Sequence, residues 1–362
     1  MKTFQNLVDE VHKPGYCHHC GGCVTFCTAV NYGALKQDEH GTPQCIDDSK
    51  CIECGLCYTI CPEVDELEMD TQNLVSWVPP VGRVLETHIA RAIDSKVLDR
   101  ATDGGVVTGL LLQLLDRGHI DGAIVTRQTG PFMREPCLAT TADEIKDAAG
   151  FYFDSSHGMK DLGKDYSTYS PSVQEFRPMV QKGLRRVAMV GTPCQIKAVR
   201  RMEALSIVPS DSIKYTLGLF CSGNFMFGET ERKKIEEIAG FSWNDMKKVN
   251  VKENLMIHLN SGKVINIPLN KLDFMKRYAC QFCSDYSAEY ADISFGGIGA
   301  DEGYTTVIIR SPEGRKIFAD AKNKTIEVLD DASHEKSRAA LKTITEKTEE
   351  KQKHAKMHRN KT

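Results

Sequence analysis

CHHCGGCVTFC (17–27) and CIECGLCYTICP (51–62) are two stretches of the chain with the same cysteine spacing. Each carries four cysteines in the pattern C-x2-C-x2-C-x3-C, and every cysteine of the second set lies 34 positions after its counterpart in the first. Such a repeat is typical of an internal duplication in which three thiolates of one half and the fourth of the other half hold a [4Fe–4S] cluster. We therefore predict one cluster on Cys17, Cys20, Cys23 and Cys61, and a second on Cys51, Cys54, Cys57 and Cys27.

Two other chemistries can explain closely spaced cysteines, namely zinc binding and disulfide bonds. Zinc sites normally draw on separate CxxC knuckles, whereas each half of this repeat carries an unbroken run of four cysteines. Cys61 is followed by Pro62, which is the usual ending of the bacterial ferredoxin pattern. The spacing therefore favours iron–sulfur clusters over both alternatives.

The composition sets limits on the rest of the chain. Its 362 residues are enough for two or three domains, and 41% of them are hydrophobic, which is ample for a buried core. A net charge of −3 gives no electrostatic support to nucleic-acid binding. The first residues carry no apolar signal region, and no stretch reaches 18 apolar residues. Because cluster thiolates need a reducing compartment, we expect a cytoplasmic protein without direct membrane insertion, which reaches a membrane only through a partner complex.

Sequence patterns divide the chain into three parts. Residues 1–75 form the ferredoxin-like unit, which we expect to be a small α+β domain that holds the two clusters. Residues 76–325 alternate between helix and strand patterns, which predicts an α/β domain with a mixed sheet and flanking helices. Residues 326–362 are charged and nearly free of aromatic residues, so we expect an exposed helix or a disordered tail.

Individual helices and strands of the α/β part can also be predicted. The strongest helix covers 104–119, where apolar residues recur at helical spacing, and further helices are predicted at 195–205 and from about residue 313. Asn260, Ser261 and Gly262 separate two apolar runs and indicate a hairpin. Other strands are predicted at 121–126, 185–190, 213–220, 291–295 and 305–310.

Further cysteines lie outside the duplicated unit. Cys194 and Cys221 each follow a predicted strand, where chain ends converge on one edge of a sheet, and Cys280 and Cys283 form a CxxC pair. Together they can hold a third [4Fe–4S] cluster. Spacing alone leaves three alternatives open, which are a redox disulfide between Cys280 and Cys283, a zinc site, or simply buried cysteines. We expect the two remaining cysteines to be structural; they are Cys45 and Cys137.

Two glycine-rich segments suggest contacts with a cofactor. Residues 102–108 (TDGGVVT) open the strongest predicted helix, and backbone N–H groups at a helix start can bind a phosphate. Asp103 argues partly against this interpretation, because its carboxylate can occupy the same position as a helix cap. Residues 296–299 (GGIG) follow a predicted strand. An ordinary capped helix and a plain turn are the alternatives for the two segments.

A set of motifs in the order TDGGVVTGLL, the 149–156 segment, GTPCQ, LFCSGNF, CQFCSDYSAEYADISFGGIG and GYTTVIIR resembles a known family. It is similar to the beta subunits of coenzyme F420-reducing hydrogenase and F420-dependent formate dehydrogenase, over about residues 83–325. The ferredoxin unit in front of this module also resembles the arrangement in the input subunit of archaeal F420H2 dehydrogenases. Many family members carry a lysine where this chain has Phe151, Tyr152 and Phe153.

The resemblance implies three bound groups or substrates in the second domain. It implies a third [4Fe–4S] cluster with Cys194, Cys221, Cys280 and Cys283 as its ligands, a bound FAD, and coenzyme F420 as the substrate. The segments that contact FAD in the family correspond here to Thr102, Gly104, Gly105, Thr108, Gly150, Ser155, Asp292, Gly296, Gly297 and Gly299.

The implied function is that of an iron–sulfur flavoprotein subunit. Coenzyme F420 and FAD would exchange a hydride, and single electrons would pass through the third cluster and then the two N-terminal clusters to or from a partner. That partner would be a hydrogenase, a formate dehydrogenase, a heterodisulfide reductase or a membrane F420H2 dehydrogenase. No general base is assigned, because the protein mainly binds and orients the cofactors.

Two other functions stay open at this point. One is a flavin reductase that uses reduced ferredoxin or NAD(P)H, and the other is a non-catalytic electron-transfer subunit without flavin. His18 and His19 lie beside the first predicted ligand. They can tune the cluster from close by, but we expect them to be exposed loop residues.

Overall fold

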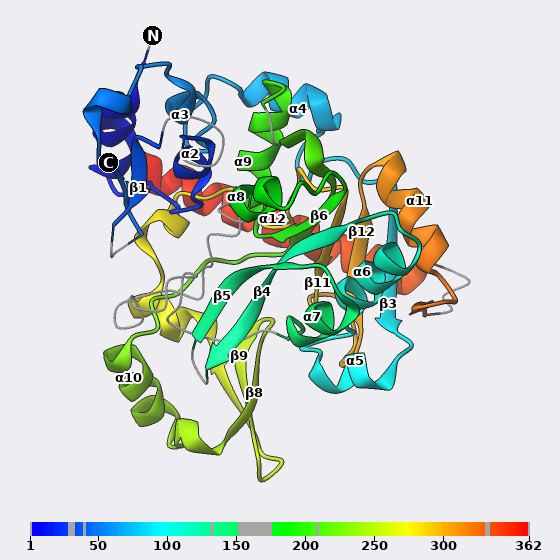
Figure 1. The fold of residues 1–362 in the computed structure, drawn as a ribbon. Coiled ribbons are helices and arrows are strands. Elements are labelled where there is room, and N and C mark those ends of the chain that lie inside the picture. The colour runs from blue at the N-terminus through cyan, green and yellow to red at the C-terminus, as the bar shows by residue number, and fades with distance from the viewer. Residues whose placement is uncertain are drawn as a thin grey trace.

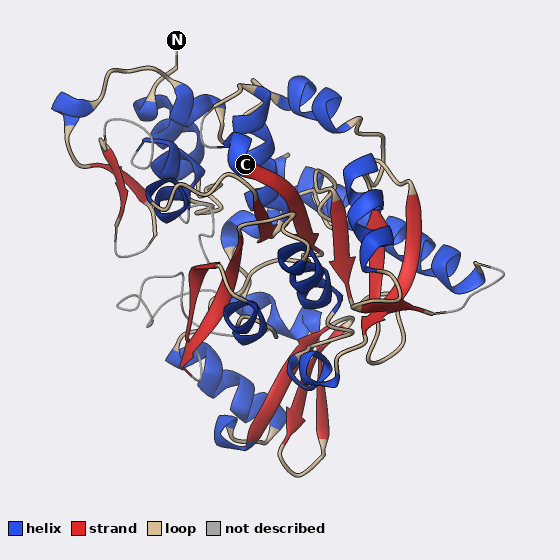
Figure 2. Cartoon of the chain, turned by 45° about the vertical axis from the view of Figure 1, so that its right-hand side comes forward, coloured by secondary structure: helices blue, strands red, loops and turns tan. Residues whose placement is uncertain are grey.

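The computed structural model describes residues 2–27, 33–38, 41–130, 133–150, 176–207, 210–329 and 334–360. A small N-terminal unit packs beside a larger α/β domain, and a three-stranded sheet extends from the far end of that domain (Figures 1 and 2). This arrangement confirms the expected fold class, which is a mixed α/β sheet with flanking helices behind a small N-terminal unit.

The N-terminal unit repeats its backbone conformation as well as its cysteines. His19 and Glu53 occupy equivalent positions and have φ of 54° and 53°, and Gly21 and Gly55 have φ of 79° and 72°. These left-handed residues turn the chain between successive cysteines, a conformation that glycine adopts at little cost. The elements of the unit are α1 (Phe4–Leu7), a π-helix (Val8–His12), α2 (Gly22–Thr25), β1 (Leu35–Gln37), β2 (Pro43–Cys45), α3 (Leu56–Thr59) and α4 (Glu68–Val75).

The second domain is organised around a mixed sheet in which the structure describes eight strands. Their order is β13-β3-β12-β11-β7-β6-β4-β5. The four central strands β11, β7, β6 and β4 run parallel to one another, and antiparallel strands flank them on both sides. The strands span Glu86–Ala92 (β3), Gly122–Gly130 (β4), Met133–Ala139 (β5), Val187–Gly191 (β6), Ile213–Leu219 (β7), Ile293–Gly296 (β11), Thr305–Ile309 (β12) and Ile326–Val328 (β13).

Helices cover both faces of this sheet. On one face, α6 (Val106–Asp116) and α11 (Pro312–Ala321) bury their apolar sides against alternate strand residues such as Ala123, Ala188 and Val307. On the other face, α9 (Pro193–Ala204) packs on the intervening residues. Buried parallel strands need cover on both faces, which explains the two helical layers. The remaining helices of the domain are α5 (Ser95–Arg100), α7 (Ala142–Asp147), α8 (Phe176–Gln181) and α10 (Glu229–Ala239).

The three-stranded sheet has a core of its own. Its order is β10-β9-β8, with β8 at Met246–Val251, β9 at Asn254–Leu259 and β10 at Val264–Pro268. β9 and β10 pair as the predicted antiparallel hairpin. Buried Leu255 and Ile257 pack with Trp243 and residues of α10. Short 3-10 helices lie at Asp48–Lys50, Ser210–Ser212, Trp243–Asp245, Leu269–Met275 and Tyr278–Gln281.

The C-terminal helix differs from the expectation of an exposed segment. α12 (Glu335–Arg359) is a helix of 25 residues that buries Ala340, Ile344, Thr348 and Ala355. Ile344 packs with Ile308 of β12, so the helix lies against the sheet. Figure 1 shows it running from the sheet to the N-terminal unit. The expectation of exposure was wrong because small and β-branched residues, rather than large aromatic ones, form its buried face.

The two domains are held together by an arginine on α9. Arg201 is fully buried, and its guanidinium donates to the carbonyl oxygens of Thr59, Cys61 and Val64 at 3.2, 2.5 and 2.5 Å. It also pairs with Glu68 at 3.0 Å. Apolar side chains continue this contact, because Phe26 and Ile60 of the N-terminal unit share one core with Met202 of α9.

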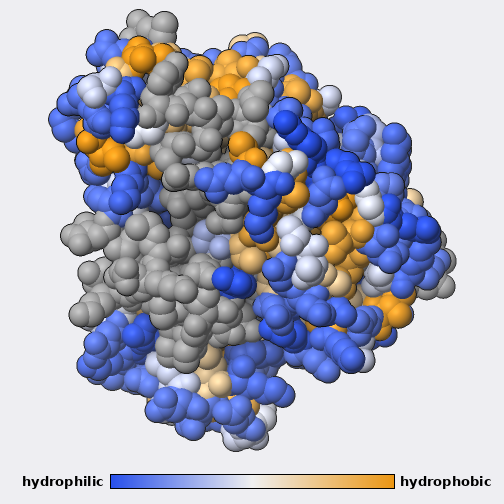
Figure 3. Space-filling model, in the orientation of Figure 1, coloured by the Kyte–Doolittle hydropathy of each residue, from blue (hydrophilic) through white to orange (hydrophobic). Residues whose placement is uncertain are grey.

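The outer surface is mixed in character. On the face drawn in Figure 3, apolar residues form separate patches among polar ones. Within the described ranges, no helix combines the length and the apolar character that a membrane crossing requires.

Loss of the Arg201 side chain should destabilise the domain contact. In Arg201→Met, three carbonyls lose a charged donor in a buried setting, while Glu68 keeps its ion pair with Lys197 at 2.7 Å, so we expect the free energy of unfolding to fall by about 3–5 kcal/mol. Urea denaturation of the anaerobically reconstituted protein, followed by circular dichroism, measures this change. Arg185→Met is the matched control, because Arg185 is exposed; equal midpoints for the two variants would contradict the assignment.

Candidate functional site

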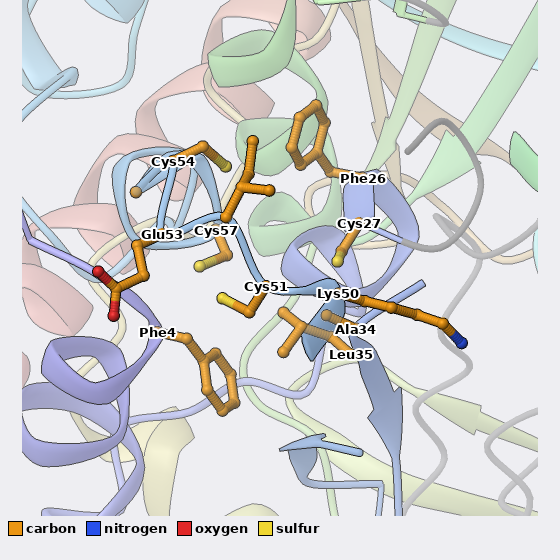
Figure 4. Close-up of a pocket in the computed structure, with 12 residues that line it drawn as sticks. Phe4, Phe26, Cys27, Ala34, Leu35, Lys50, Cys51, Glu53, Cys54 and Cys57 are labelled. Atoms are coloured by element: carbon orange, nitrogen blue, oxygen red, sulfur yellow. The ribbon is translucent and has the colours of Figure 1, made fainter. Parts of the chain in front are cut away.

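Each predicted N-terminal quartet of cysteines lines one small cavity. Cys17, Cys20, Cys23 and Cys61 surround a cavity of about 20 Å³. Cys27, Cys51, Cys54 and Cys57 surround another of about 30 Å³. Figure 4 shows the second set, with Cys27 facing the other three thiols across the cavity. In both sets the fourth thiol comes from the other half of the repeat, which is the exchange that the spacing predicts.

Burial shapes the chemistry of these thiols. It raises the pKa of Cys17 and of Cys57 to about 12, and it raises the pKa of Cys23 and Cys61 well above the ordinary value, with neighbouring cysteines adding to the rise. Free thiols in this setting stay protonated at neutral pH. Iron must displace those protons to bind, so the four-thiol sets fit a group that carries strong positive charge. All fourteen cysteines are within the described residues and are free rather than in disulfides.

The four cysteines of the second domain also converge. Cys194 lies in the first turn of α9, Cys221 follows β7, and Cys280 lies in the 3-10 helix Tyr278–Gln281 with Cys283 two residues beyond it. After burial, the charges of Cys283, Cys20 and Cys221 contribute to the raised pKa of Cys194. The pKa of Cys221, about 11, is likewise raised first by burial and then by Cys280 and Cys283. These mutual effects indicate that the four thiols lie in one region of the domain, where they could serve as the ligand set of one cluster.

Cys280 differs from its neighbours because its thiolate is stabilised. Burial alone would raise its pKa, but a hydrogen bond with His18 and the charge of Arg277 lower the pKa to about 6. The backbone N–H of Asn224 also donates to the Cys280 Sγ at 3.2 Å. Arg277 is itself buried and donates to the carbonyl oxygen of His18 at 3.1 Å. Cys280 therefore contacts the loop that carries Cys17, through His18.

His18 is a buried link between the two domains, so the expectation that it is exposed was wrong. Only 6% of its surface is accessible, and its Nε2 lies 2.6 Å from Glu63 Oε1. Burial lowers the pKa of His18, but Glu63 and Cys280 raise it more, to about 9. Arg359 of α12 also pairs with Glu63, at 2.5 Å. Sequence reasoning missed Glu63 and Arg277 because their partners lie far away in the sequence: Glu63 pairs with His18 and Arg359, and Arg277 donates to His18.

A larger cavity, of about 310 Å³, lies at the carboxyl ends of the four central parallel strands. Thr126 of β4, Thr192 after β6, Phe220 after β7 and Gly297 after β11 line it. Open α/β sheets bind ligands at this edge. The end of β8 completes the wall with Asn250, Val251 and Lys252, so the small sheet closes one side of the cavity.

The start of α6 faces this cavity with its backbone donors. Val106, Val107 and Thr108 line the cavity, and the first N–H groups of a helix have no partner within the helix. Gly105 caps the helix with φ of 68°, and no side chain caps it. Asp103 instead accepts a hydrogen bond from Asn250 Nδ2 at 2.9 Å. The expected competition from Asp103 is therefore absent at this helix start, and the site fits a phosphate.

The predicted flavin contacts divide into two groups. Those that line the cavity are Thr102, Gly105, Thr108, Gly150, Gly296 and Gly297. Three others serve the packing of the domain. A Cβ on Gly104 would lie 2.7 Å from the Ala90 carbonyl oxygen, and one on Gly299 would lie 2.8 Å from Ala340. Asp292 is buried and pairs with Arg200 at 3.0 Å.

Several other sequence predictions concern single residues. Ser155 and the segment Phe151–Phe153 lie outside the described residues. Cys137 is buried in β5. The Sγ of Cys45 lies 3.2 Å from Asp48 Oδ1, and Cys45 packs beside the N-terminal quartets in a cluster of side chains that includes Cys57.

The fold and these sites together define an iron–sulfur protein in which a two-cluster unit is docked onto an α/β domain with a ligand cavity. Residues 10–62 match the family model of a 4Fe-4S dicluster domain. Residues 87–162 and 184–334 match the N-terminal and C-terminal models of the coenzyme F420 hydrogenase/dehydrogenase beta subunit.

Individual relatives and one solved structure agree with these family models. The coenzyme F420 hydrogenase subunit beta of Methanothermobacter thermautotrophicus is 31% identical over 67% of this chain and 82% of its own length. A subunit of the F(420)H(2) dehydrogenase of Methanosarcina mazei is 26% identical over 90% of this chain and 87% of its own. A chain in the structure of the F420-reducing [NiFe] hydrogenase complex from Methanosarcina barkeri superposes with a TM-score of 0.68 at 27% identity, over 78% of this chain and 93% of that one. The chain belongs to the family of coenzyme F420 hydrogenase/dehydrogenase beta subunits, and its N-terminal unit is an iron–sulfur domain.

Proposed function

We propose that this chain is a flavin-containing subunit that exchanges a hydride with coenzyme F420 and single electrons with a partner oxidoreductase subunit. The observation that carries the proposal is Cys221. It lines the large cavity and also belongs to the third cysteine quartet. One residue therefore borders both the place for a hydride carrier and the place for a one-electron centre.

The cavity is the proposed binding site of FAD and, beside it, of coenzyme F420. FAD exchanges both hydrides and single electrons when bound, which is the conversion that this function requires. The α6 start would hold its pyrophosphate with backbone N–H groups, and the helix dipole would favour the negative charge. The names of the relatives support F420 as the hydride carrier, since all three proteins compared above are named for F420 or its reduced form.

The third quartet is proposed to connect the cavity to the N-terminal unit. Cys194 packs with Cys20 and Ala198 in one cluster of side chains. The Cys17 quartet is therefore nearer to the third quartet, and the Cys27 quartet is the more distant one. We propose that electrons move in that order and leave near Cys51 and Cys54 to a partner subunit of a hydrogenase, formate dehydrogenase, heterodisulfide reductase or membrane F420H2 dehydrogenase.

A direct activity test separates this function from its two alternatives. We expect flavin absorbance in the anaerobically purified protein, and reduction of a viologen dye with F420H2 but not with NADH. A subunit that only transfers electrons would carry no flavin. Activity with NADH, or with reduced ferredoxin and not F420H2, would instead indicate a flavin reductase.

The number of clusters can be measured independently of activity. Three quartets predict three [4Fe–4S] clusters, or about twelve iron atoms per chain. Iron analysis of the anaerobically purified protein should give that value. About eight iron atoms would leave the two N-terminal clusters and remove the third.

The order of the quartets predicts different defects for two substitutions. Cys54→Ser should stop transfer to the partner but leave flavin reduction by F420H2 intact, because that step takes place in the second domain. Cys283→Ser should slow flavin reoxidation by every acceptor that receives electrons through the clusters. Stopped-flow absorbance at the flavin band measures both. Equal loss of flavin reduction in both variants, with native circular dichroism, would rule out this order.

A further inference from the structure

A lysine of the C-terminal helix reaches the third quartet of cysteines. The Nζ of Lys351 donates to the carbonyl oxygens of Cys221 and Asp285, both at 2.7 Å. These two backbone positions flank the quartet, because Cys221 is a member of it and Asp285 follows Cys283 by two residues. The lysine side chain is partly buried, and its ammonium group is held at a defined point beside the thiols.

The environment of this ammonium group consists of carbonyl oxygens and thiols. Among the described residues, no carboxylate oxygen forms an ion pair with Lys351, although its Nζ makes two hydrogen bonds to carbonyl oxygens. The groups that act on it most strongly are the thiols of Cys283, Cys221 and Cys280, followed by Asp285. A buried cation is costly without negative charge nearby, and a cluster bound at the thiols of Cys283, Cys221 and Cys280 would supply that charge beside Lys351.

The rest of α12 fixes this lysine in position. Thr348 and Ala355, one turn before and one turn after it, are buried. The neighbouring Gln352 donates to the carbonyl oxygen of Pro80 at 2.8 Å, and Arg359 pairs with Glu63 of the N-terminal unit. The helix begins at Glu335, beyond residue 334 where the matched family models end. Lys351 therefore belongs to a segment that the family models do not cover.

We propose that Lys351 is the counter-charge of the third iron–sulfur cluster and raises its reduction potential. This inference rests on the proposed function, because it needs the cluster on Cys194, Cys221, Cys280 and Cys283. Four thiolates give such a cluster a net negative charge, and reduction adds one more. A fixed positive charge nearby stabilises the reduced form more than the oxidised form, and net charge around a cluster is one of the factors that set its potential.

Three substitutions at Lys351 separate its charge from its packing. Lys351→Gln and Lys351→Met remove the charge, whereas Lys351→Arg keeps it together with N–H donors. Lys342→Gln is the matched control, because Lys342 lies on the same helix with its side chain 80% exposed. The readout is a potentiometric titration of the dithionite-reducible clusters followed by electron paramagnetic resonance, with iron content measured on the same samples.

We expect one cluster to become harder to reduce in the Gln and Met variants. Its equilibrium constant for one-electron reduction should fall at least about tenfold, which corresponds to a midpoint about 59 mV more negative. The Arg variant and Lys342→Gln should titrate like the wild type. If the Gln variant loses about four iron atoms and the Arg variant keeps them, the charge is needed even to hold the cluster, which also supports the proposal.

Two outcomes overturn the inference, and they differ from failure of the proposed function. Unchanged midpoints in all Lys351 variants that hold about twelve iron atoms would show that the lysine has no electrostatic role. Loss of iron from both the Gln and Arg variants would show that the residue acts through packing alone. A wild-type protein with only about eight iron atoms would instead remove the third cluster, and with it the proposed function.

Discussion

The hydrogen bonds of Arg201 fix the position of the N-terminal unit against the second domain, and the proposed electron path depends on that position. The guanidinium binds the carbonyl oxygens around Cys61, a member of the first quartet, and it projects from α9, the helix whose first turn carries Cys194. One buried side chain thus ties a member of the N-terminal quartet to the helix that carries a member of the third quartet. Electron transfer between centres needs short distances, so a loose N-terminal unit would break the path even if every cluster were intact.

Electrostatics imposes a second constraint on the same region. Three sets of thiols lie in partly or fully buried positions, where charged thiolates are unfavourable without positive groups nearby. Arg277 and His18 lie at the boundary with the N-terminal unit, and Lys351 reaches the third quartet from the C-terminal helix. Each of these cations comes from a different segment of the chain. The fold therefore gathers positive charge around Cys280 and its neighbours from three segments.

The sequence predicted the parts of this structure that depend on local patterns. Cysteine spacing predicted both N-terminal quartets with their exchanged fourth members, and apolar runs predicted the central strands β4, β6, β7 and β11 to within a few residues. The edge strands β5 and β13, and β3 beside β13, were missed because their residues lack a clear alternation. His18 was misjudged for a different reason. Its burial depends on Glu63, Arg277 and Cys280, which lie 45 or more positions away, and no local pattern shows such contacts.

Gly104 and Gly105 are a second case in which local sequence patterns do not reveal tertiary contacts. Gly104 and Gly105 belong to the segment that was expected to bind a phosphate, but a Cβ on Gly104 would lie 2.7 Å from the Ala90 carbonyl oxygen and one on Gly105 would lie 3.0 Å from Val97. Gly104 allows α6 to approach β3 and β12, and Gly105 adopts the positive φ that starts the helix. They place the helix start, with its backbone N–H groups, at the carboxyl edge of the sheet, where Asn250 of β8 and the following Lys252 also line the cavity. The cavity at this edge therefore follows from the packing of three separate elements, which are the central sheet, α6 and the small sheet.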